Sequence, residues 1–368
     1  MKISRALAVS KKEYLHIIRD PVSLSLSFLM PALLLFLFGY AINFDLKDAK
    51  ICVLDRDISP SSREIIRNFT NSGYFKVYSF LEDEKEIDEI LDKGKAYLVL
   101  WIPENFSKNL KSGKMAEIQI IIDGSDSQTA SLILNYVSGI TENFYEKVSN
   151  EELKRIDLKI RFWYNQDLKS KNFIIPGLIA LIIAIISALL SSLTISREWE
   201  KGTMEKLIST PLKPSEINLG KLIPYFGIGA IDLIFSVMAA ILIFRVPFKG
   251  NFLFFALISS IYLFGGLSYG TLISSITRSQ VLSIQISIVT TYLPTLLLSG
   301  FIFSIENMPK FIKALTYFFP ARYFVFISRN VFLKGSPLNF LIFEGLLLLI
   351  FSSIFFFISI KKFKKEVF

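Results

Sequence analysis

The chain has 368 residues, of which 52% are hydrophobic and 14% aromatic, and its formal net charge is +9 at pH 7. Soluble globular domains contain about 45–50% apolar residues, so this composition indicates a membrane protein. Basic segments that face anionic lipid at the cytoplasmic surface account for the positive charge. The charge therefore gives no reason to expect a nucleic-acid partner.

Six apolar segments each have about 20 residues or slightly more, which is the length that a helix needs to cross about 30 Å of hydrocarbon. Lys and Arg are concentrated before the first segment, after the second and at the C-terminus. Because basic residues mark cytoplasmic loops, we expect both termini to be cytoplasmic and the chain to be integral to the plasma membrane, as a bacterial inner-membrane protein. The six predicted spans cover residues 22–44, 173–195, 221–245, 251–275, 281–303 and 338–360.

Residues 1–21 predict an amphipathic helix before the first span. Five residues recur at spacings of three and four, and so share one face of a helix. We expect this helix to lie on the cytoplasmic leaflet with its cations towards the lipid headgroups; an unremarkable basic flank is the alternative. The shared face is formed by Ile3, Leu7, Ser10, Tyr14 and Ile17.

Residues 45–170 lie between the first two predicted spans and carry enough charge to be soluble. Strand-like and helix-like segments alternate four times in this region, which predicts an α/β domain with its own core. The sequence therefore predicts an α-helical polytopic membrane protein with six transmembrane helices and an inserted extracytoplasmic α/β domain. The predicted strands cover residues 50–55, 74–80, 96–102 and 116–123, and the helices 59–69, 82–94, 103–113 and about 128–155.

The sequence lacks the residue sets that common catalytic and metal sites need. It has no G-x-x-x-x-G-K-[ST] motif, which forms the phosphate-binding loop of many ATPases. His16 is the single histidine, so His-based triads and His-rich metal sites are excluded. Cys52, the single cysteine, lies in a predicted strand and is expected to be buried. We therefore expect no enzyme, no catalytic residue, no metal site and no cofactor bound by this chain.

The charged segment 197–212, REWEKGTMEKLISTPL, follows the second span on the expected cytoplasmic side. Gly202 is expected to end the helix that leaves the membrane, and Thr203 to cap a short new helix that stops at Pro211. From spacing alone, two interpretations stay open: a docking surface for a soluble partner and a solvated connector. The apolar face of the short helix would be formed by Met204, Leu207 and Ile208.

This segment is similar to a pattern in the ABC-2 permeases, the membrane subunits of type-2 ABC exporters that pair with a separate ATPase. In that family, RE-x-E-x-GT-x-E-x-L-x-x-TP forms the coupling helix that docks into the nucleotide-binding subunit. The matching residues within 197–211 are Arg197, Glu198, Glu200, Gly202, Thr203, Glu205, Leu207, Thr210 and Pro211. The end of the family's connecting helix is matched by Lys12, Glu13, Arg19, Asp20 and Pro21.

The resemblance extends over essentially the whole chain. The segment VLDRDISPSSREIIRNFTNSGYF resembles the outer domain of the drug-exporter-like branch, and residues 304–337 resemble a loop whose short helices re-enter the outer leaflet. The resemblance implies a permease that binds an ATPase subunit, pairs with a second copy or a paralogue, and contacts membrane lipid. It also implies that ATP and Mg²⁺ are bound by the ATPase. The size of the outer domain leads to a further hypothesis, that it docks a periplasmic adaptor where a cell has two membranes.

Three residues within predicted spans are candidates for the translocation pathway. Asp232 falls near the middle of the third span, where an ionisable group is costly and usually faces a cavity or a partner; a hydrogen bond for structure alone is the alternative. Pro294 and Gly300 could bend the fifth span near the outer gate, or kink it without a role. Gly266 and Gly270 are expected to allow close helix packing within the subunit.

The function that the resemblance implies is ATP-driven efflux of a hydrophobic or amphiphilic substrate, drug or lipid-like. A passive channel or a membrane scaffold without an ATPase is the alternative. A receptor that signals inwards would need a cytoplasmic output domain, and the cytoplasmic segments are too short to fold one.

Overall fold

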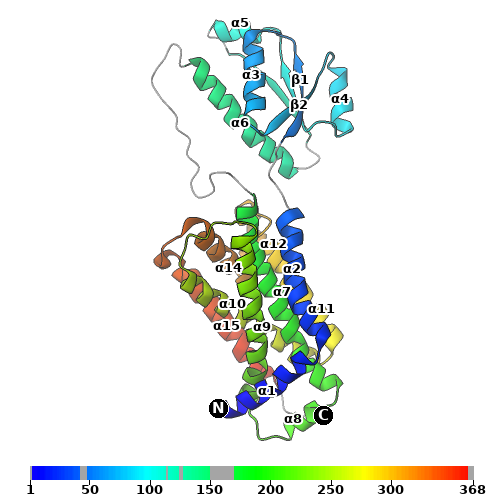
Figure 1. The fold of residues 1–368 in the computed structure, drawn as a ribbon, viewed down its shortest axis with the longest axis vertical. Helices are drawn as coiled ribbons and strands as arrows, with labels where there is room; N and C mark the ends of the chain where they lie inside the picture. Colours follow the sequence, from blue (N-terminus) through cyan, green and yellow to red (C-terminus); the bar gives the residue numbers. More distant parts are fainter. Residues whose placement is uncertain (1, 42–47, 113–114, 124–126, 150–169, 364–368) are drawn as a thin grey trace. The chain divides into compact units, whose positions relative to one another are not determined.

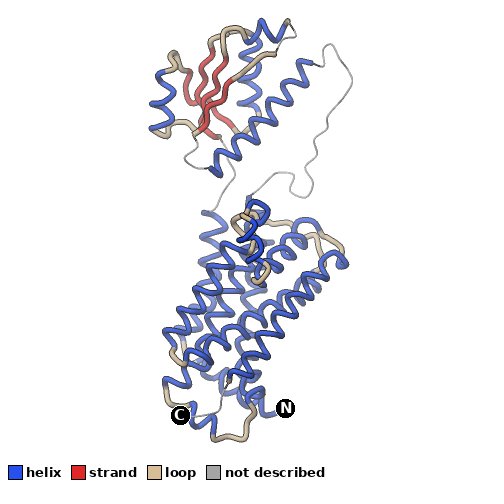
Figure 2. Tube along the Cα trace, turned by 180° about the vertical axis from the view of Figure 1, so that it is seen from behind, coloured by secondary structure: helices blue, strands red, loops and turns tan. Residues whose placement is uncertain are grey.

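The computed structural model describes residues 2–41, 48–112, 115–123, 127–149 and 170–363. The chain divides into two compact units, one formed by Met1–Asn43 and Phe162–Phe368 and the other by Phe44–Arg161. The first unit is a bundle of helices and the second is an α/β domain (Figures 1 and 2).

Helices make up the first unit, with short loops between most of them (Figure 2). Those before the α/β domain in the chain are α1 (Ile3–Ile18) and α2 (Pro21–Ala41). Those after it are α7 (Ser170–Glu200), α8 (Met204–Ile208), α9 (Pro214–Leu242), α10 (Phe252–Thr277), α11 (Gln280–Ser287), the π-helical turn η1 (Ile288–Tyr292), α12 (Leu293–Leu298), the 3₁₀ turn η2 (Ile305–Asn307), α13 (Lys310–Thr316), α14 (Pro320–Arg329), the π-helical turn η3 (Asn330–Lys334) and α15 (Leu338–Lys362).

Within the described residues, five helices are long and apolar enough to cross a membrane: α7, α9, α10, the continuous α11–η1–α12 helix, and α15. They correspond to the second to sixth predicted spans. The predicted first span, 22–44, falls on α2 and on residues beyond it that lie outside the described part of the chain. In α2, the apolar stretch Ser27–Tyr40 is shorter than the other five.

The end of the fifth apolar helix differs from the sequence prediction. The predicted span reached residue 303, but α12 ends at Leu298. Gly300 has a φ of +83°, a left-handed conformation that is incompatible with a continuing helix and easy for glycine. Gly300 therefore lies past the helix and does not bend it from within. Pro294 lies within the continuous α11–η1–α12 helix, directly after the π-helical turn.

Helix α7 is the centre of the bundle, because α2, α9, α10, α11 and α14 all pack against it. Its closest neighbour is α10, and small residues bring the two together. A Cβ built on Gly266 would lie 2.1 Å from Ser187 Oγ, and one on Gly270 would lie 2.0 Å from Ser191 Oγ. The predicted close packing at these two glycines is therefore internal to the subunit.

The second unit has a four-stranded sheet in the order β2-β1-β3-β4. The first three strands are parallel to one another and β4 is antiparallel to β3. Helices cover both faces, and all four predicted strands are present. The elements are β1 (Ala49–Asp55), α3 (Pro60–Asn71), β2 (Phe75–Phe80), α4 (Lys85–Asp92), β3 (Leu98–Ile102), α5 (Phe106–Lys111), β4 (Gln119–Ile122) and α6 (Ser127–Ser149).

Each face of this sheet has its own apolar core. The larger core joins Ile51 and Leu100 of the sheet to Phe69 of α3 and Ile133 of α6. The smaller one, on the side of α4, contains Cys52, which is fully buried with its Sγ 3.2 Å from Ser79 Oγ. The prediction that Cys52 is buried is confirmed. The last six residues of the predicted helix 128–155 lie outside the described part of the chain.

Candidate functional site

The charged segment after α7 forms a turn and a short helix. Helix α7 ends at Glu200, and Gly202 turns the chain with a φ of +65°. Nothing lies within 4 Å of a Cβ built on Gly202, so the left-handed backbone, and not a lack of space, is what favours glycine there. Helix α8 then occupies only Met204–Ile208.

The apolar face of α8 points into the protein. Met204 and Leu207 are 2% and 8% exposed, and they pack in one cluster with Ile195, Ile217 and Phe363. Of the two interpretations that the spacing left open, a docking surface cannot be formed by Met204 and Leu207, because both side chains are buried within the protein. The side chains of α8 and its flanks that remain exposed are polar: Lys201, Glu205, Lys206 and Ser209.

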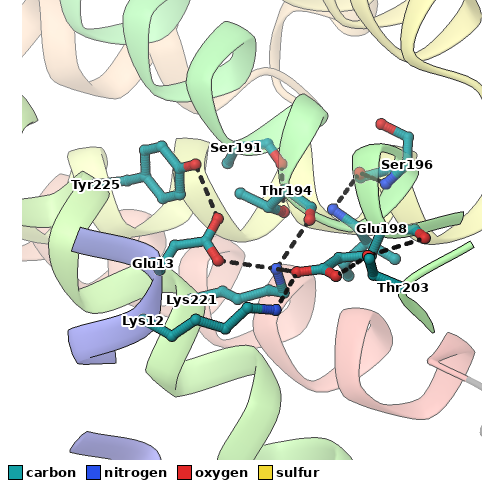
Figure 3. Close-up of polar contacts among 11 residues, drawn as sticks. Lys12, Glu13, Ser191, Thr194, Ser196, Glu198, Thr203, Lys221 and Tyr225 are labelled. Atoms are coloured by element: carbon teal, nitrogen blue, oxygen red, sulfur yellow. Dashed lines mark hydrogen bonds and ion pairs between the residues drawn. The ribbon is translucent and has the colours of Figure 1, made fainter. Parts of the chain in front are cut away.

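Behind α8, an ion cluster joins three helices (Figure 3); Glu13, Glu198 and Lys221 are buried in it, and Lys12 is exposed at its edge. Lys221 of α9, 1% exposed, places its Nζ 3.0 Å from Glu13 Oε2 of α1 and 3.2 Å from Glu198 Oε1 of α7. Lys12 of α1 reaches the same Glu198 oxygen at 2.9 Å. Two cations thus face two carboxylates, and their charges sum to zero. This matters because an uncompensated buried charge is strongly destabilising.

Neutral groups complete the cluster. Lys221 also donates to the backbone oxygen of Thr194, at 3.0 Å, and the Tyr225 hydroxyl donates to Glu13 Oε1, at 3.0 Å. The Thr203 hydroxyl donates to Glu198 Oε2. Thr203 therefore does not cap α8 with its side chain as predicted. Its backbone is in the helical region and not in the extended region typical of capping residues, and its hydroxyl instead bonds the carboxylate.

Two further contacts tie the end of α7 to its neighbours. Arg197 forms an ion pair of 3.1 Å with Asp20, at the junction of α1 and α2. Glu200 accepts hydrogen bonds from the backbone N–H and the side-chain amide of Gln280, at 2.7 and 2.5 Å. The acidic and basic residues at the end of α7 thus hold the chain itself together. Among the predicted coupling residues, Glu205 is an exposed carboxylate of α8, and Thr210 and Pro211 lie in the loop that follows.

Helix α1 has one face on the protein and one exposed face. Ala6, Val9 and Glu13 are buried against α9, where Gly220 lets the two backbones approach. Of the predicted apolar face, Ser10 and Ile17 belong to the buried side. The exposed side carries Ile3, Leu7, Tyr14, Leu15 and Ile18, and Arg19 is exposed as well.

Substituting Gly220 is expected to detach α1. A Cβ on Gly220 would lie 2.6 Å from Ala6 O and 2.6 Å from Val9 Cβ, so Gly220→Val forces the helices apart. The expected result is several-fold faster tryptic cleavage after Lys12 in the detergent-solubilised protein. Gly227→Val is the matched control on the same helix, because nothing lies within 4 Å of its Cβ. Equal cleavage rates in the two variants would contradict the proposed packing role.

Lys221 and Tyr225 were not predicted from the sequence as site residues. A usable signal was present: Lys221 is a lone cation at the start of the predicted span 221–245, and a charge next to an apolar run is expensive unless it has a partner. Because α9 begins at Pro214, Lys221 lies two turns inside the helix, where its side chain cannot escape to solvent. The partners could not be found from the sequence, since Glu13 is 208 residues away.

Asp232 lies in α9, away from this cluster. It is 2% exposed, and neither carboxylate oxygen has a hydrogen-bond partner among the described residues. The alternative that Asp232 serves structure through a hydrogen bond therefore has no support from its contacts. Its role in a pathway stays a prediction, as do those of Pro294 and Gly300.

The bundle of long apolar helices with an inserted α/β domain defines a polytopic membrane protein. Residues 21–361 match the family described as ABC-2 family transporter proteins, and the chain belongs to that family. It is 36% identical to the "Probable multidrug ABC transporter permease YbhS" of Escherichia coli (strain K12), over 90% of this chain and 89% of that one. It is 30% identical to the "Probable multidrug ABC transporter permease YbhR" of Escherichia coli (strain K12), over 91% of each chain. "ABC transporter G family member 20" of Dictyostelium discoideum is 24% identical over 91% of this chain and 47% of that one.

Proposed function

We propose that this chain is the membrane-spanning permease subunit of an ABC exporter. In this proposal α2 is the first of six spans, both termini are cytoplasmic and the α/β domain is extracytoplasmic. The subunit pairs with a second copy or a paralogue. A separate ATPase subunit binds ATP and Mg²⁺ and docks on the exposed polar face of α8. The substrate is hydrophobic or amphiphilic, and the names of the relatives from Escherichia coli favour drugs.

The arrangement of α8 is the observation that carries this proposal. Its exposed side is polar, and its inner side is fixed by Met204 and Leu207 in an apolar cluster. Glu198, directly behind it, connects α7 to α1 and α9 through ion pairs. A subunit that moves α8 would therefore move three helices together, which is how a rigid-body motion passes into a membrane domain.

Reversing the charge of Glu205 is expected to uncouple the transporter. Glu205→Lys changes the exposed face of α8 without touching a span or the buried cluster, so membrane insertion should be unaffected. The ATPase subunit should co-purify with the wild type and be lost from the variant, and efflux should fall to background. Glu64→Lys, on exposed helix α3 of the other unit, is the control that makes the same charge change.

Two results would contradict the proposal in different ways. If Glu205→Lys retains the ATPase and normal efflux, α8 is not the docking element. If no ATPase co-purifies with the wild type and reconstituted protein conducts substrate without nucleotide, the passive channel is the better description. A periplasmic adaptor is a further proposed partner, and co-purification with the full-length chain tests it separately.

A further inference from the structure

A cavity of about 730 Å³ lies at the end of the bundle opposite α8. Its walls come from the loop after α12, from α13, α14 and η3, and from the first turns of α7 and α15. Glu344, in its wall, is six residues into α15, or about 9 Å along the helix. In a helix that crosses a membrane, this depth corresponds to the zone between lipid headgroups and hydrocarbon.

The cavity contains charges of both signs that do not neutralise one another. Among the described residues, no ion pair joins Glu306 or Glu344 to Lys313, Arg322 or Arg329. The charged side chains of the wall are Glu306, Lys313, Arg322, Arg329, Lys334 and Glu344. A ligand with one negative and one positive group could bind both kinds of charge, its negative group at the cations and its positive group at a carboxylate.

Two of these side chains are open to a ligand. Glu344 Oε2 is buried and has no hydrogen-bond partner among the described residues. Lys313 Nζ likewise has no hydrogen bond or ion pair within the same part of the chain, although the Lys313 backbone is bonded within α13. Arg329, by contrast, is held in place: it donates to the backbone oxygens of Gly300 and Phe301, both at 2.8 Å. Because a buried carboxylate oxygen without a donor is costly, Glu344 Oε2 calls for a donor from outside the chain, although Glu344 as a whole is half-buried.

An apolar surface adjoins this polar cavity. Phe326 and Phe343 line it and are 39% and 65% exposed. Phe340 packs against Phe326 with the two rings tilted and their centroids 6.0 Å apart. Polar groups inside and exposed aromatic rings at the edge form an amphiphilic site. Such a site fits a ligand with a charged head and hydrocarbon tails.

We infer that this cavity binds the headgroup of a zwitterionic phospholipid that carries a primary ammonium group. Lys313 binds the phosphate, and Glu344 accepts a hydrogen bond from the ammonium. Arg322, which Thr316 and Tyr317 hold in the wall of the cavity, adds a second positive charge near the phosphate. A quaternary ammonium has no N–H and would leave Glu344 Oε2 unsatisfied. The acyl chains lie along Phe326 and Phe343. This inference concerns lipid binding by the permease alone and does not rest on the coupling to an ATPase.

Native mass spectrometry of the delipidated full-length chain tests the inference. The protein is titrated with palmitoyl-oleoyl phosphatidylethanolamine, phosphatidylglycerol and phosphatidylcholine in turn. Phosphatidylethanolamine should bind most tightly. Glu344→Gln should weaken its binding about tenfold, the usual effect of losing a hydrogen bond to a charged group, without weakening phosphatidylglycerol. Lys313→Gln should weaken both lipids.

Lys310→Gln is the matched control, because Lys310 is on the same helix as Lys313 and is exposed outside the cavity. It should bind all three lipids as the wild type does. Three results would each overturn the inference: equal binding of the three lipids, no effect of Glu344→Gln in a variant with wild-type thermal stability, or full competition by free phosphoethanolamine. The last would mean that a soluble headgroup, and not a membrane lipid, is the ligand.

Discussion

Lys221→Met is expected to lower the stability of the helical unit by about 3–5 kcal/mol, the usual cost of breaking a buried ion pair by removing one partner. The methionine fills a similar volume but leaves Glu13 and Glu198 with only Lys12 as a counter-charge. The buried cluster then has a net charge of −1. Fluorescence-detected size-exclusion chromatography after heating should show a marked drop in the midpoint of thermal unfolding. Lys310→Met, at an exposed position, should leave it unchanged.

A second substitution separates charge from packing. In Lys221→Met/Glu13→Gln the cluster is neutral again, because Lys12 still pairs with Glu198 at 2.9 Å. The glutamine can still accept the hydrogen bond from Tyr225. We expect the double variant to regain most of the lost stability, although Glu13→Gln alone should be destabilising. If the double variant is no more stable than Lys221→Met, charge compensation is not what Lys221 provides.

Elements set by local patterns were predictable from the sequence. Apolar length located α7, α9, α10 and α15, and alternation located the four strands, because both signals depend on neighbouring residues only. The predicted fifth span ended at residue 303, beyond the end of α12 at Leu298, because the apolar run continues past the helix and includes Gly300. The left-handed φ of Gly300 follows from how the next loop folds back, which composition does not show.

The candidate site was only half predictable. Similarity to a family pattern selected Glu198 and Glu13 but could not say what they contact. Both turn inwards to Lys221, a residue that no pattern selected. The direction in which the apolar face of α8 points could not be predicted, for a related reason. Two apolar residues on a short helix can point to a partner or to the core, and only the position of Ile195 and Ile217 decides which.

Substitutions at the glycines of α10 are expected to disrupt its packing on α7. The Cβ of Gly266→Ala would lie 2.1 Å from Ser187 Oγ and 2.9 Å from Ser187 Cβ. The Cβ of Gly270→Ala would lie 2.0 Å from Ser191 Oγ and 2.6 Å from the backbone oxygen of Ala188. Overpacking of this kind typically costs about 1–3 kcal/mol, and more where backbone must move. Both variants should therefore give less folded protein, with the larger loss at Gly270.

The two positions should differ in how they can be rescued. Ser187→Gly removes both atoms that obstruct Gly266→Ala, and the hydroxyl it deletes bonds only within α7. The double variant should thus be only about 1 kcal/mol less stable than the wild type, which is the cost of placing a glycine inside a helix. Ser191→Gly cannot rescue Gly270→Ala, because the Ala188 oxygen is backbone and stays in place. Equal rescue at both sites in thermal unfolding would show that the backbones of α7 and α10 yield easily. In that case the close approach of α7 and α10 would not be the reason that positions 266 and 270 require glycine.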